Sequence, residues 1–301
     1  MLFLTEDEVR GLLPMGEAIR LMRLTFEALG RGDAQSQPRR RLILPTGSIL
    51  HSNAGAYGDY FGTKFYSTNP KHEAHFLFSL YDANNAAPLA LMQANYLGQI
   101  RTGAAAGYAA DLLASPDATV LGVIGSGFQA ISQVEAMRAV RPTIREVRVW
   151  SRKSEKRERF AREIGGVAVE SAEAAVHGAH IVVTATNAKE PVLERRWISP
   201  GTFIAAVGSN NANRRELPAD LLAAASLVAV DSMEQARIEA GDLILANNWS
   251  NVVELQTLMR RYDSARIVVF KSVGLGVEDV AAGSYVYEQA VKRGIGKALY
   301  S

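Results

Sequence analysis

Two glycines, Gly125 and Gly127, stand between a short apolar run and a segment with helical periodicity. The apolar run, residues 120–124, predicts a buried strand, and residues 128–140 predict a helix. In such a strand–turn–helix, glycines permit a tight turn, and N–H groups at the helix start face a phosphate. The spacing therefore predicts a dinucleotide pyrophosphate site formed by Gly125, Ser126, Gly127, Phe128 and Gln129. A glycine turn in another kind of α/β protein is the competing interpretation.

The residues that follow the next predicted strand, 146–150, bear on the choice of dinucleotide. An Asp or Glu at this point bonds the ribose hydroxyls of NAD(H) and repels a 2′-phosphate. This chain has Ser151, Arg152 and Lys153 instead, and a hydroxyl with two cations suits a phosphate group. The pattern favours NADP(H). NAD(H) stays possible, because the charge-rich segment that follows also suits a solvated helix start.

The composition is that of an ordinary globular protein with one large domain or two smaller ones. Of its 301 residues, 48% are hydrophobic and 21% charged, and the net charge of +2 gives no reason to expect nucleic acid or membrane as a partner. The chain has no cysteine, and its five histidines lack metal-binding spacing, so no metal site is expected. The first residues lack a basic segment and a long apolar stretch, which predicts a cytoplasmic protein.

The N-terminal third changes from helical to strand-like patterning. Thr5 and Glu8 have capping-box spacing and predict a short helix to residue 13, after which Pro14 opens a second helix. Between residues 40 and 95, short apolar runs are broken by Gly, Asn and Pro, which predicts a mostly antiparallel sheet with a hairpin turn at 82–85. An alanine-rich helix is expected at 97–113.

From residue 118, strand and helix patterns alternate, which predicts an α/β fold with a doubly wound parallel sheet of the Rossmann type. Strands are expected at 120–124, 146–150, 181–185, 203–207, 227–230 and 267–270, and helices at 128–140, 154–164, 171–177, 218–224 and 279–293. Asp231 follows one of these strands and is expected to cap a helix from Met233. The late position of the glycine loop leaves the N-terminal block free to hold a substrate.

Read together, five motifs resemble the ornithine cyclodeaminase/mu-crystallin family over nearly the whole chain. They are Gly-Val-Ile-Gly-Ser-Gly-Phe-Gln-Ala at 122–130, Arg-Thr-Gly-Ala-Ala at 101–105, Ala-Val-Gly at 206–208 with Arg-Glu-Leu at 215–217, Val-Asp-Ser at 230–232, and Val-Phe-Lys-Ser-Val-Gly at 269–274 with Glu278 and Asp279. The resemblance implies an NAD(P)-binding Rossmann domain at 118–275. It also implies an α+β substrate-binding and dimerisation domain at 1–117, completed by a helix at 276–301, and hence a homodimer.

The resemblance implies chemistry and site residues as well. Members form or consume the C=N bond of an amino acid's imine with a nicotinamide cofactor. Arg41, four residues before Pro45, and Lys64 match a substrate carboxylate clamp, and Arg101 matches an arginine near both ligands. Further cofactor contacts are implied at Thr102, Thr186, Val207, Ser272 and Val273. Taken alone, Arg41 reads as a surface arginine, Lys64 as an outward strand lysine and Arg101 equally as a salt bridge between domains.

Two positions depart from the cyclodeaminase pattern. Asn210 stands where ornithine cyclodeaminase has an aspartate that transfers protons, and an amide cannot accept a proton. His51, thirteen residues before Lys64, replaces a glutamate. Because histidine titrates near neutral pH, His51 or an ordered water is expected to protonate an imine. A strand histidine bonded to the backbone is the alternative.

With the clamp retained and the aspartate lost, the sequence favours an NAD(P)H-dependent enzyme that reduces imino acids, such as pyrroline-2-carboxylate to proline. Lys64, His51 and Asn210 are its expected catalytic residues. Ornithine cyclodeaminase, alanine dehydrogenase and a ligand-binding protein like mu-crystallin stay open as alternatives.

Overall fold

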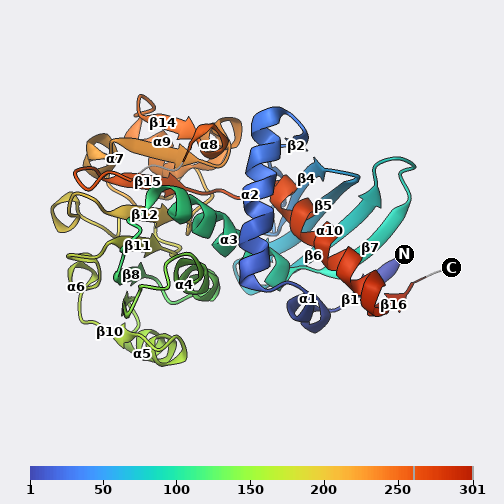
Figure 1. Ribbon diagram of the computed structural model, residues 1–301, viewed down its shortest axis with the longest axis horizontal. Coiled ribbons are helices and arrows are strands. Elements are labelled where there is room, and N and C mark those ends of the chain that lie inside the picture. The colour runs from blue at the N-terminus through green and yellow to red at the C-terminus, as the bar shows by residue number, and fades with distance from the viewer. Residues whose placement is uncertain (260–261, 300–301) are drawn as a thin grey trace. The chain divides into compact units, whose positions relative to one another are not determined.

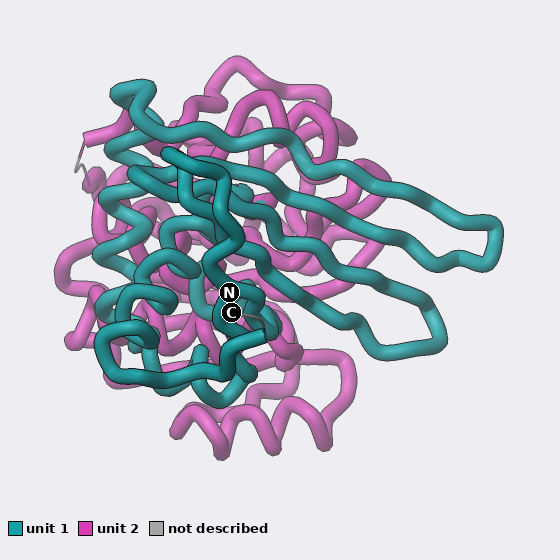
Figure 2. The backbone as a smooth tube through the Cα atoms, turned by 90° about the vertical axis from the view of Figure 1, so that its right-hand side faces the viewer, with its two compact units in different colours: residues 1–101, 274–301 teal, residues 102–273 magenta. Residues whose placement is uncertain are grey.

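The computed structural model describes residues 1–259 and 262–299. The chain divides into two compact units, shown in different colours in Figure 2. Unit 1 contains residues 1–101 and 274–301, and unit 2 contains residues 102–273. The division falls at Arg101, inside a continuous helix, α3 (Asn95–Leu113), whereas the sequence placed the domain boundary after residue 117.

Unit 1 is built on one sheet, in which the pairs from β2 to β7 are antiparallel. The strands run in the order β16-β1-β7-β6-β5-β4-β2, with β3 paired to β4, and β1 lies parallel to β7. Their bounds are β1 (Leu2–Leu4), β2 (Ala34–Ser36), β3 (Arg40–Ile43), β4 (Ile49–Tyr57), β5 (Tyr60–Asn69), β6 (His72–Asp82), β7 (Pro88–Gln93) and β16 (Lys297–Ala298). The expected hairpin turn follows β6, where Asp82 Oδ1 accepts bonds from the N–H groups of Asn84 and Asn85.

Three further helices belong to unit 1. They are α1 (Glu6–Leu12), α2 (Met15–Arg31) and α10 (Gly276–Arg293). The predicted capping box of Thr5 and Glu8 opens α1, and Pro14 is the N-cap of α2 rather than its first residue. Helix α10 starts earlier than expected, at Gly276, so that its two acidic residues fall in the first turn, where the helix dipole favours negative charge.

Helix α10 lies directly on the sheet because glycines remove the side chains between them. A Cβ on Gly276 would lie 2.4 Å from the carbonyl oxygen of Ala54 on β4, and a Cβ on Gly55 would lie 2.4 Å from the nitrogen of Val277. Within unit 1, Figure 1 shows α10 in red along β4, β5 and β6. This close packing brings the first turn of α10 against the centre of the sheet.

Unit 2 contains an eight-stranded parallel sheet, as the alternating pattern predicted. The strands run in the order β10-β9-β8-β11-β12-β15-β13-β14. Their bounds are β8 (Val120–Ile124), β9 (Glu146–Trp150), β10 (Val167–Ala168), β11 (Ile181–Thr184), β12 (Phe203–Ala206), β13 (Leu227–Val230), β14 (Val252–Glu254) and β15 (Val268–Lys271). Strands β11, β12 and β13 are buried throughout, as in a sheet covered on both faces. The strand order reverses between β8 and β11, where doubly wound folds bind their ligands.

The remaining helices cover this sheet. They are α4 (Phe128–Val140), α5 (Ser154–Glu163), α6 (Ala172–Val176), α7 (Ala219–Ala224), α8 (Met233–Glu239), α9 (Gly241–Ala246) and the 3₁₀ turns η1 (Arg195–Trp197) and η2 (Leu255–Thr257). In unit 2 the sequence missed α9, β10 and β14, which are too short to show a clear period. Among the described helices, none has the length and apolar character that a membrane crossing requires.

Candidate active site

The glycine loop connects β8 to α4, and its two glycines have different structural roles. Gly125 has a φ of 113°, and a Cβ there would lie 2.4 Å from the carbonyl oxygen of Ala185, so the fold itself requires glycine. Gly127 is the N-cap of α4 without a side-chain hydrogen bond, and the space around its Cα is open. A phosphate therefore has both room and N–H donors at Gly127, as a dinucleotide pyrophosphate needs.

A groove of about 1240 Å³ opens over this loop. Its walls come from the ends of four neighbouring strands. They are formed by residues 124–129 after β8, 150–153 with Lys156 after β9, 185–190 with Val192 after β11, and Gly208 with Arg214 after β12. Ser126 and Ser151 join two of these walls through their hydroxyl oxygens, 2.8 Å apart. The groove thus brings together the predicted cofactor residues Gly125, Ser126, Gly127, Phe128, Gln129, Ser151, Arg152, Lys153 and Thr186. Val207, Ser272 and Val273 are not in its lining.

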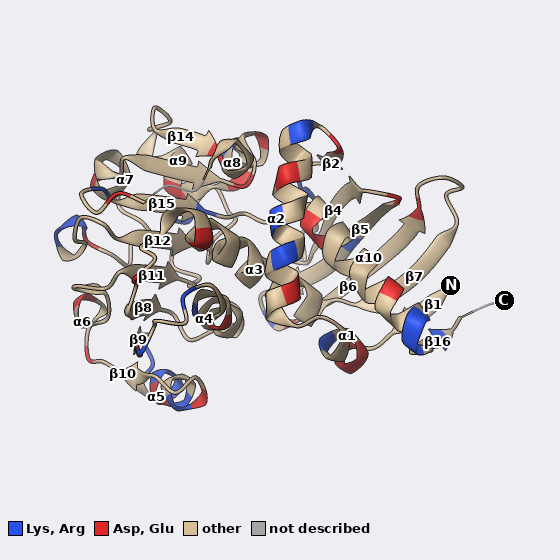
Figure 3. Cartoon of the chain, viewed as in Figure 1, with Lys and Arg blue, Asp and Glu red and all other residues tan. Residues whose placement is uncertain are grey.

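Basic side chains gather at the β9 end of the groove. Arg152, Lys153 and Lys156 line it and are exposed, and helix α5, which starts at this end, carries many charged positions in Figure 3. Lys189 and Arg214 add two more cations to the lining, on the loops after β11 and β12. With its three cations, the β9 end of the groove suits a group with more than one negative charge.

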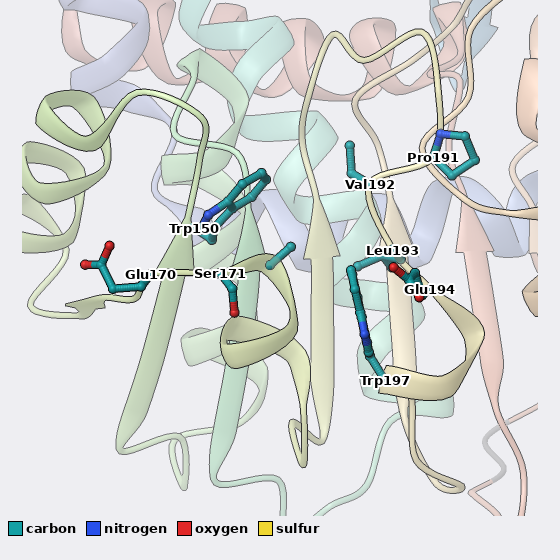
Figure 4. Close-up of a pocket in the computed structure, with 9 residues that line it drawn as sticks. Trp150, Glu170, Ser171, Pro191, Val192, Leu193, Glu194 and Trp197 are labelled. Atoms are coloured by element: carbon teal, nitrogen blue, oxygen red, sulfur yellow. The ribbon is translucent and has the colours of Figure 1, made fainter.

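A second recess, of about 420 Å³, adjoins the groove and shares Trp150 and Val192 with it. Figure 4 shows Trp150 at one side and Trp197 at another, with Pro191 and Leu193 between strands of the same sheet. Its two acids form ion pairs with neighbouring arginines, Glu170 with Arg157 and Glu194 with Arg196. The recess therefore offers mainly apolar and aromatic surface beside the groove.

A buried carboxylate, Glu216, ties two of the strand-end loops together. It accepts hydrogen bonds from the backbone nitrogen of Thr186 at 2.7 Å, the Thr186 hydroxyl at 2.8 Å and the backbone nitrogen of Gly208 at 2.8 Å. All three contacts are donors. A carboxylate accepts them with both of its oxygens, whereas the NH₂ group of an amide would face at least one of these donors. Glu216 thus fixes the loop after β11 to the loop after β12.

A second buried pair, Lys271 and Asp242, holds the loop that carries Asn210. Lys271 Nζ donates to the carbonyl oxygen of Ser209 at 2.6 Å and lies 3.0 Å from Asp242 Oδ2. Asp242 Oδ1 accepts the N–H groups of Glu216 and Leu217. The half-buried Asn210 therefore follows a backbone position that is anchored to β15.

Asp231 plays a different part from the one predicted. Ser232, not Asp231, caps α8, since its hydroxyl accepts the N–H of Gln235. The Asp231 carboxylate instead accepts the Ser272 hydroxyl at 2.9 Å and the Val273 N–H at 2.7 Å. The prediction of a cap was wrong because it weighed only neighbours in sequence. Ser272 and Val273, two of the cofactor contacts that the resemblance implied, thus donate to Asp231.

In unit 1, Lys64 belongs to a buried cluster of four charged side chains. Its Nζ lies 2.7 Å from Asp279 Oδ1, which also accepts Arg101 Nε at 2.9 Å. Arg101 Nη1 lies 2.7 Å from Glu278 Oε2. Each of the four side chains is at most 6% exposed. Lys64 is therefore not an outward strand lysine, and the ion pairs of Arg101 lie within one unit.

Burial changes the acidity of Lys64. Loss of hydration and the nearby Arg101 charge lower its pKa from the usual value near 10.5 to about 8, although Asp279 acts in the opposite direction. The side chain is thus mostly an ammonium near neutral pH but can lose its proton within the range in which enzymes work. A lysine with this pKa is suited to general acid catalysis.

Arg39 and Asn53, which the sequence did not single out, lie on the same face of the sheet. Arg39 Nε donates to Asn53 Oδ1 at 3.0 Å, and its Nη2 donates to the carbonyl oxygen of Gly274 at 3.2 Å. Asn53 stands directly opposite Lys64 in the β4–β5 ladder. Strand periodicity was the available signal, because Asn53 lies two residues from His51 and therefore shares its face.

His51 lies between Arg41 on β3 and Tyr66 on β5, which are its partners in the two ladders. Its ring stacks on Tyr66 with centroids 4.3 Å apart, and Nε2 is 2.9 Å from the Thr68 hydroxyl. Burial and the charges of Arg41 and Arg39 lower the His51 pKa to about 4. The imidazole is therefore neutral near pH 7, which removes the reason for expecting it to be the proton donor.

The model of the ornithine cyclodeaminase/mu-crystallin family matches residues 1–294. The chain belongs to this family. A Δ1-pyrroline-2-carboxylate reductase from Bacillus cereus is 33% identical, with 99% of each chain covered. The predictions of the family, of the fold and of an enzyme are thereby confirmed.

Two solved structures are similar over the whole chain. The Thermococcus litoralis Δ1-pyrroline-2-carboxylate reductase in complex with NADH and L-proline has a TM-score of 0.93 and 29% identity, covering 99% of this chain and 100% of that one. An archaeal alanine dehydrogenase dimer with bound NAD also has a TM-score of 0.93, with 30% identity, covering 100% of this chain and 99% of the other.

The role of Glu216 can be tested by replacing it with glutamine. In Glu216→Gln, the amide must turn its NH₂ group toward an N–H donor of Thr186 or Gly208, so we expect a loss of about 1–3 kcal/mol in the free energy of unfolding. Urea unfolding measures this loss, and NADPH titration should show weaker binding. The control is Glu190→Gln. The Glu190 carboxylate pairs with Arg215 but is 76% exposed, so this change should alter the free energy of unfolding by less than about 0.5 kcal/mol. Equal effects in the two variants would contradict the assignment.

Proposed function

We propose that this enzyme reduces an α-imino acid, such as pyrroline-2-carboxylate, with NADPH. The buried Lys64 ammonium, held by Asp279 and carrying a pKa of about 8, is the observation on which the proposal rests. Relatives named as pyrroline-2-carboxylate reductases support it. In the balanced reaction, the imine takes up one hydride and one proton and becomes the amino acid, while NADPH becomes NADP⁺.

The cofactor is assigned to the groove of unit 2. The open space at Gly127 and the N-terminus of α4 fit a pyrophosphate, and the loop at Thr186 forms the opposite wall. When bound, the nicotinamide supplies the hydride. The basic end at Arg152 and Lys153 supports NADP(H), because a 2′-phosphate adds negative charge there, although the solved relatives were determined with NADH and NAD.

The substrate is assigned to the charged face of unit 1. In an α-imino acid the carboxylate and the imine nitrogen are attached to the same carbon, so one ammonium can contact both. Lys64 has three N–H donors, and Asp279 takes one of them. Lys64 then holds the carboxylate and gives its proton to the imine nitrogen, with Arg41 nearby as a second carboxylate contact. Arg101, already bonded to two acids, serves to position Asp279.

The loss of the cyclodeaminase aspartate supports reduction over deamination. Asn210 follows the anchored Ser209 and can orient a substrate nitrogen, but an amide takes no proton from it. Reduction of a preformed imine needs a proton donor and no such base. Ornithine cyclodeamination and alanine oxidation are therefore the alternatives that the assay must separate.

A homodimer is also proposed. The archaeal alanine dehydrogenase relative is described as a dimer. In unit 1, Leu42, Ile43 and Leu50 on β3 and β4 are 61%, 65% and 47% exposed, which supports a contact with a second copy through this part of the sheet.

Purified protein mixed with pyrroline-2-carboxylate and NADPH should oxidise NADPH, seen as a fall in its absorbance, and form proline. Parallel reactions contain ornithine with NAD⁺, and pyruvate with ammonia and NADPH. Turnover of pyrroline-2-carboxylate well above the other two supports the proposal. No NADPH loss above the buffer rate, or ammonia release from ornithine as the faster reaction, would sink it.

Replacing Arg152 with alanine tests the cofactor assignment. Arg152→Ala should raise the KM for NADPH about tenfold or more and leave the KM for NADH nearly unchanged, because only NADPH carries the 2′-phosphate. Arg159→Ala, an exposed arginine of α5, is the matched control. Equal effects of Arg152→Ala on both cofactors would show that Arg152 does not read this phosphate.

The pH dependence tests Lys64 as the acid. Since Lys64 must be protonated to donate, kcat/KM should fall about tenfold per pH unit as the pH rises above about 8. Lys64→Arg keeps the charge without a titration in this range, so its activity should be lower and the alkaline fall should disappear. Lys71→Met removes an exposed lysine and should keep the wild-type profile. If kcat/KM of Lys64→Arg still falls at alkaline pH as in wild type, the titrating group belongs to the substrate and not to Lys64.

A further inference from the structure

Asn53 is a neutral polar side chain in the middle of the charged face of unit 1. It is 1% exposed and stands opposite Lys64 across the β4–β5 ladder. Directly opposed residues of an antiparallel pair project to the same face with their Cβ atoms close together. The side chain of Asn53 is therefore a neighbour of the proposed proton donor.

The orientation of the Asn53 amide follows from its partner. Arg39 Nε donates to Oδ1 at 3.0 Å, and a guanidinium has only donors to offer. The amide oxygen must therefore face Arg39, and the NH₂ group must point to the other side. Arg39 is itself buried and donates to the Gly274 carbonyl, so the orientation is held from both ends.

Within the described part of the chain, the Asn53 NH₂ group has no hydrogen-bond acceptor, although it is buried. Buried donors without a partner are rare and costly, and they call for an explanation. Asp279 bonds Lys64 and Arg101 through Oδ1, and Glu278 bonds Arg101 through Oε2. The buried Asp279 Oδ2 is an acceptor without a hydrogen-bond partner among the described residues, and it does not bond the Asn53 NH₂ group. A ligand that meets Asn53 between the cations Arg39 and Lys64 would be an acceptor with negative charge.

We propose that the Asn53 NH₂ group donates a hydrogen bond to the substrate carboxylate and makes the site selective for that group. This inference rests on the proposed function, because it assigns an imino-acid carboxylate to unit 1. Asn53 and Lys64 then bind the carboxylate from neighbouring strands, and Arg39 keeps the amide from turning its oxygen toward it. A trapped water as the only partner of Asn53 is the competing explanation.

Binding calorimetry tests this inference without depending on turnover. The probes are pyrrole-2-carboxylate and its uncharged amide, pyrrole-2-carboxamide, each titrated into the protein with and without NADPH. The variants are Asn53→Asp, which replaces the donor with a negative charge, and Asn53→Ala, which removes it. Asn69→Asp makes the same chemical change at the far end of β5. There Asn69 Oδ1 accepts the Lys71 N–H and Nδ2 donates to the Ser48 hydroxyl, and an aspartate can accept from both groups because the hydroxyl can turn its hydrogen toward it.

Wild type and Asn69→Asp should bind the carboxylate much more tightly than the carboxamide. Asn53→Ala should weaken the carboxylate about tenfold to hundredfold, and Asn53→Asp should weaken it further and abolish the preference. NADPH affinity should stay within about twofold, which shows that the variants are folded. If wild type binds the carboxylate but fails to reduce imines, the proposed function fails and this inference stands.

The inference is overturned if Asn53→Ala binds pyrrole-2-carboxylate as well as wild type does, whatever its melting temperature. That result would assign Asn53 to a purely structural role with a trapped water. If Asn53→Asp fails to fold, Asn53→Ala decides alone. It removes the donor, and an unchanged carboxylate preference in this variant would contradict the inference.

Discussion

The interaction of the Asp279 carboxylate with two buried cations is the one on which unit 1 depends. A buried lysine and a buried arginine are both costly unless negative charge is placed beside them. Asp279 meets both cations with one oxygen, and Glu278 adds the second charge. These acids reach the cations because α10 packs on β4 without side chains between the two backbones. The ion pairs thus depend on the glycine contacts, because those contacts let α10 lie close enough to β4 for its acids to reach the cations.

Unit 2 uses buried charge in a second way. Glu216, Asp242 and Asp231 bind backbone N–H groups at the strand ends, so the loops around the groove are held before any ligand arrives. The glycine loop at Gly127 is left without a side-chain cap. Rigid walls and an open loop together provide pre-organised donors for an anionic ligand, which reduces the cost of ordering them on binding.

The fold and the nucleotide loop could be predicted because their signals are local. The strand, the glycines and the helix at residues 120–140 are neighbours in sequence, and each expresses its own period or turn chemistry. The partners of Lys64 could not be predicted, since Asp279 is 215 residues away and its motif says nothing about what it touches. The low pKa of His51 could not be predicted for a related reason. Its pKa depends on burial and on Arg41 and Arg39, which only the strand register brings to it.

The place of α10 after unit 2 in the sequence has a consequence for synthesis. Unit 2 lies between the two segments of unit 1, so all of it is synthesised before α10. The sheet of unit 1 is made first but must wait for α10, and for β16 to pair with β1. Until then Lys64 and Arg101 have no counter-charges, and the face that later binds α10 is open. All the residues of unit 2 are therefore available for folding before α10 is made, whereas unit 1 is completed only once α10 and β16 have been added.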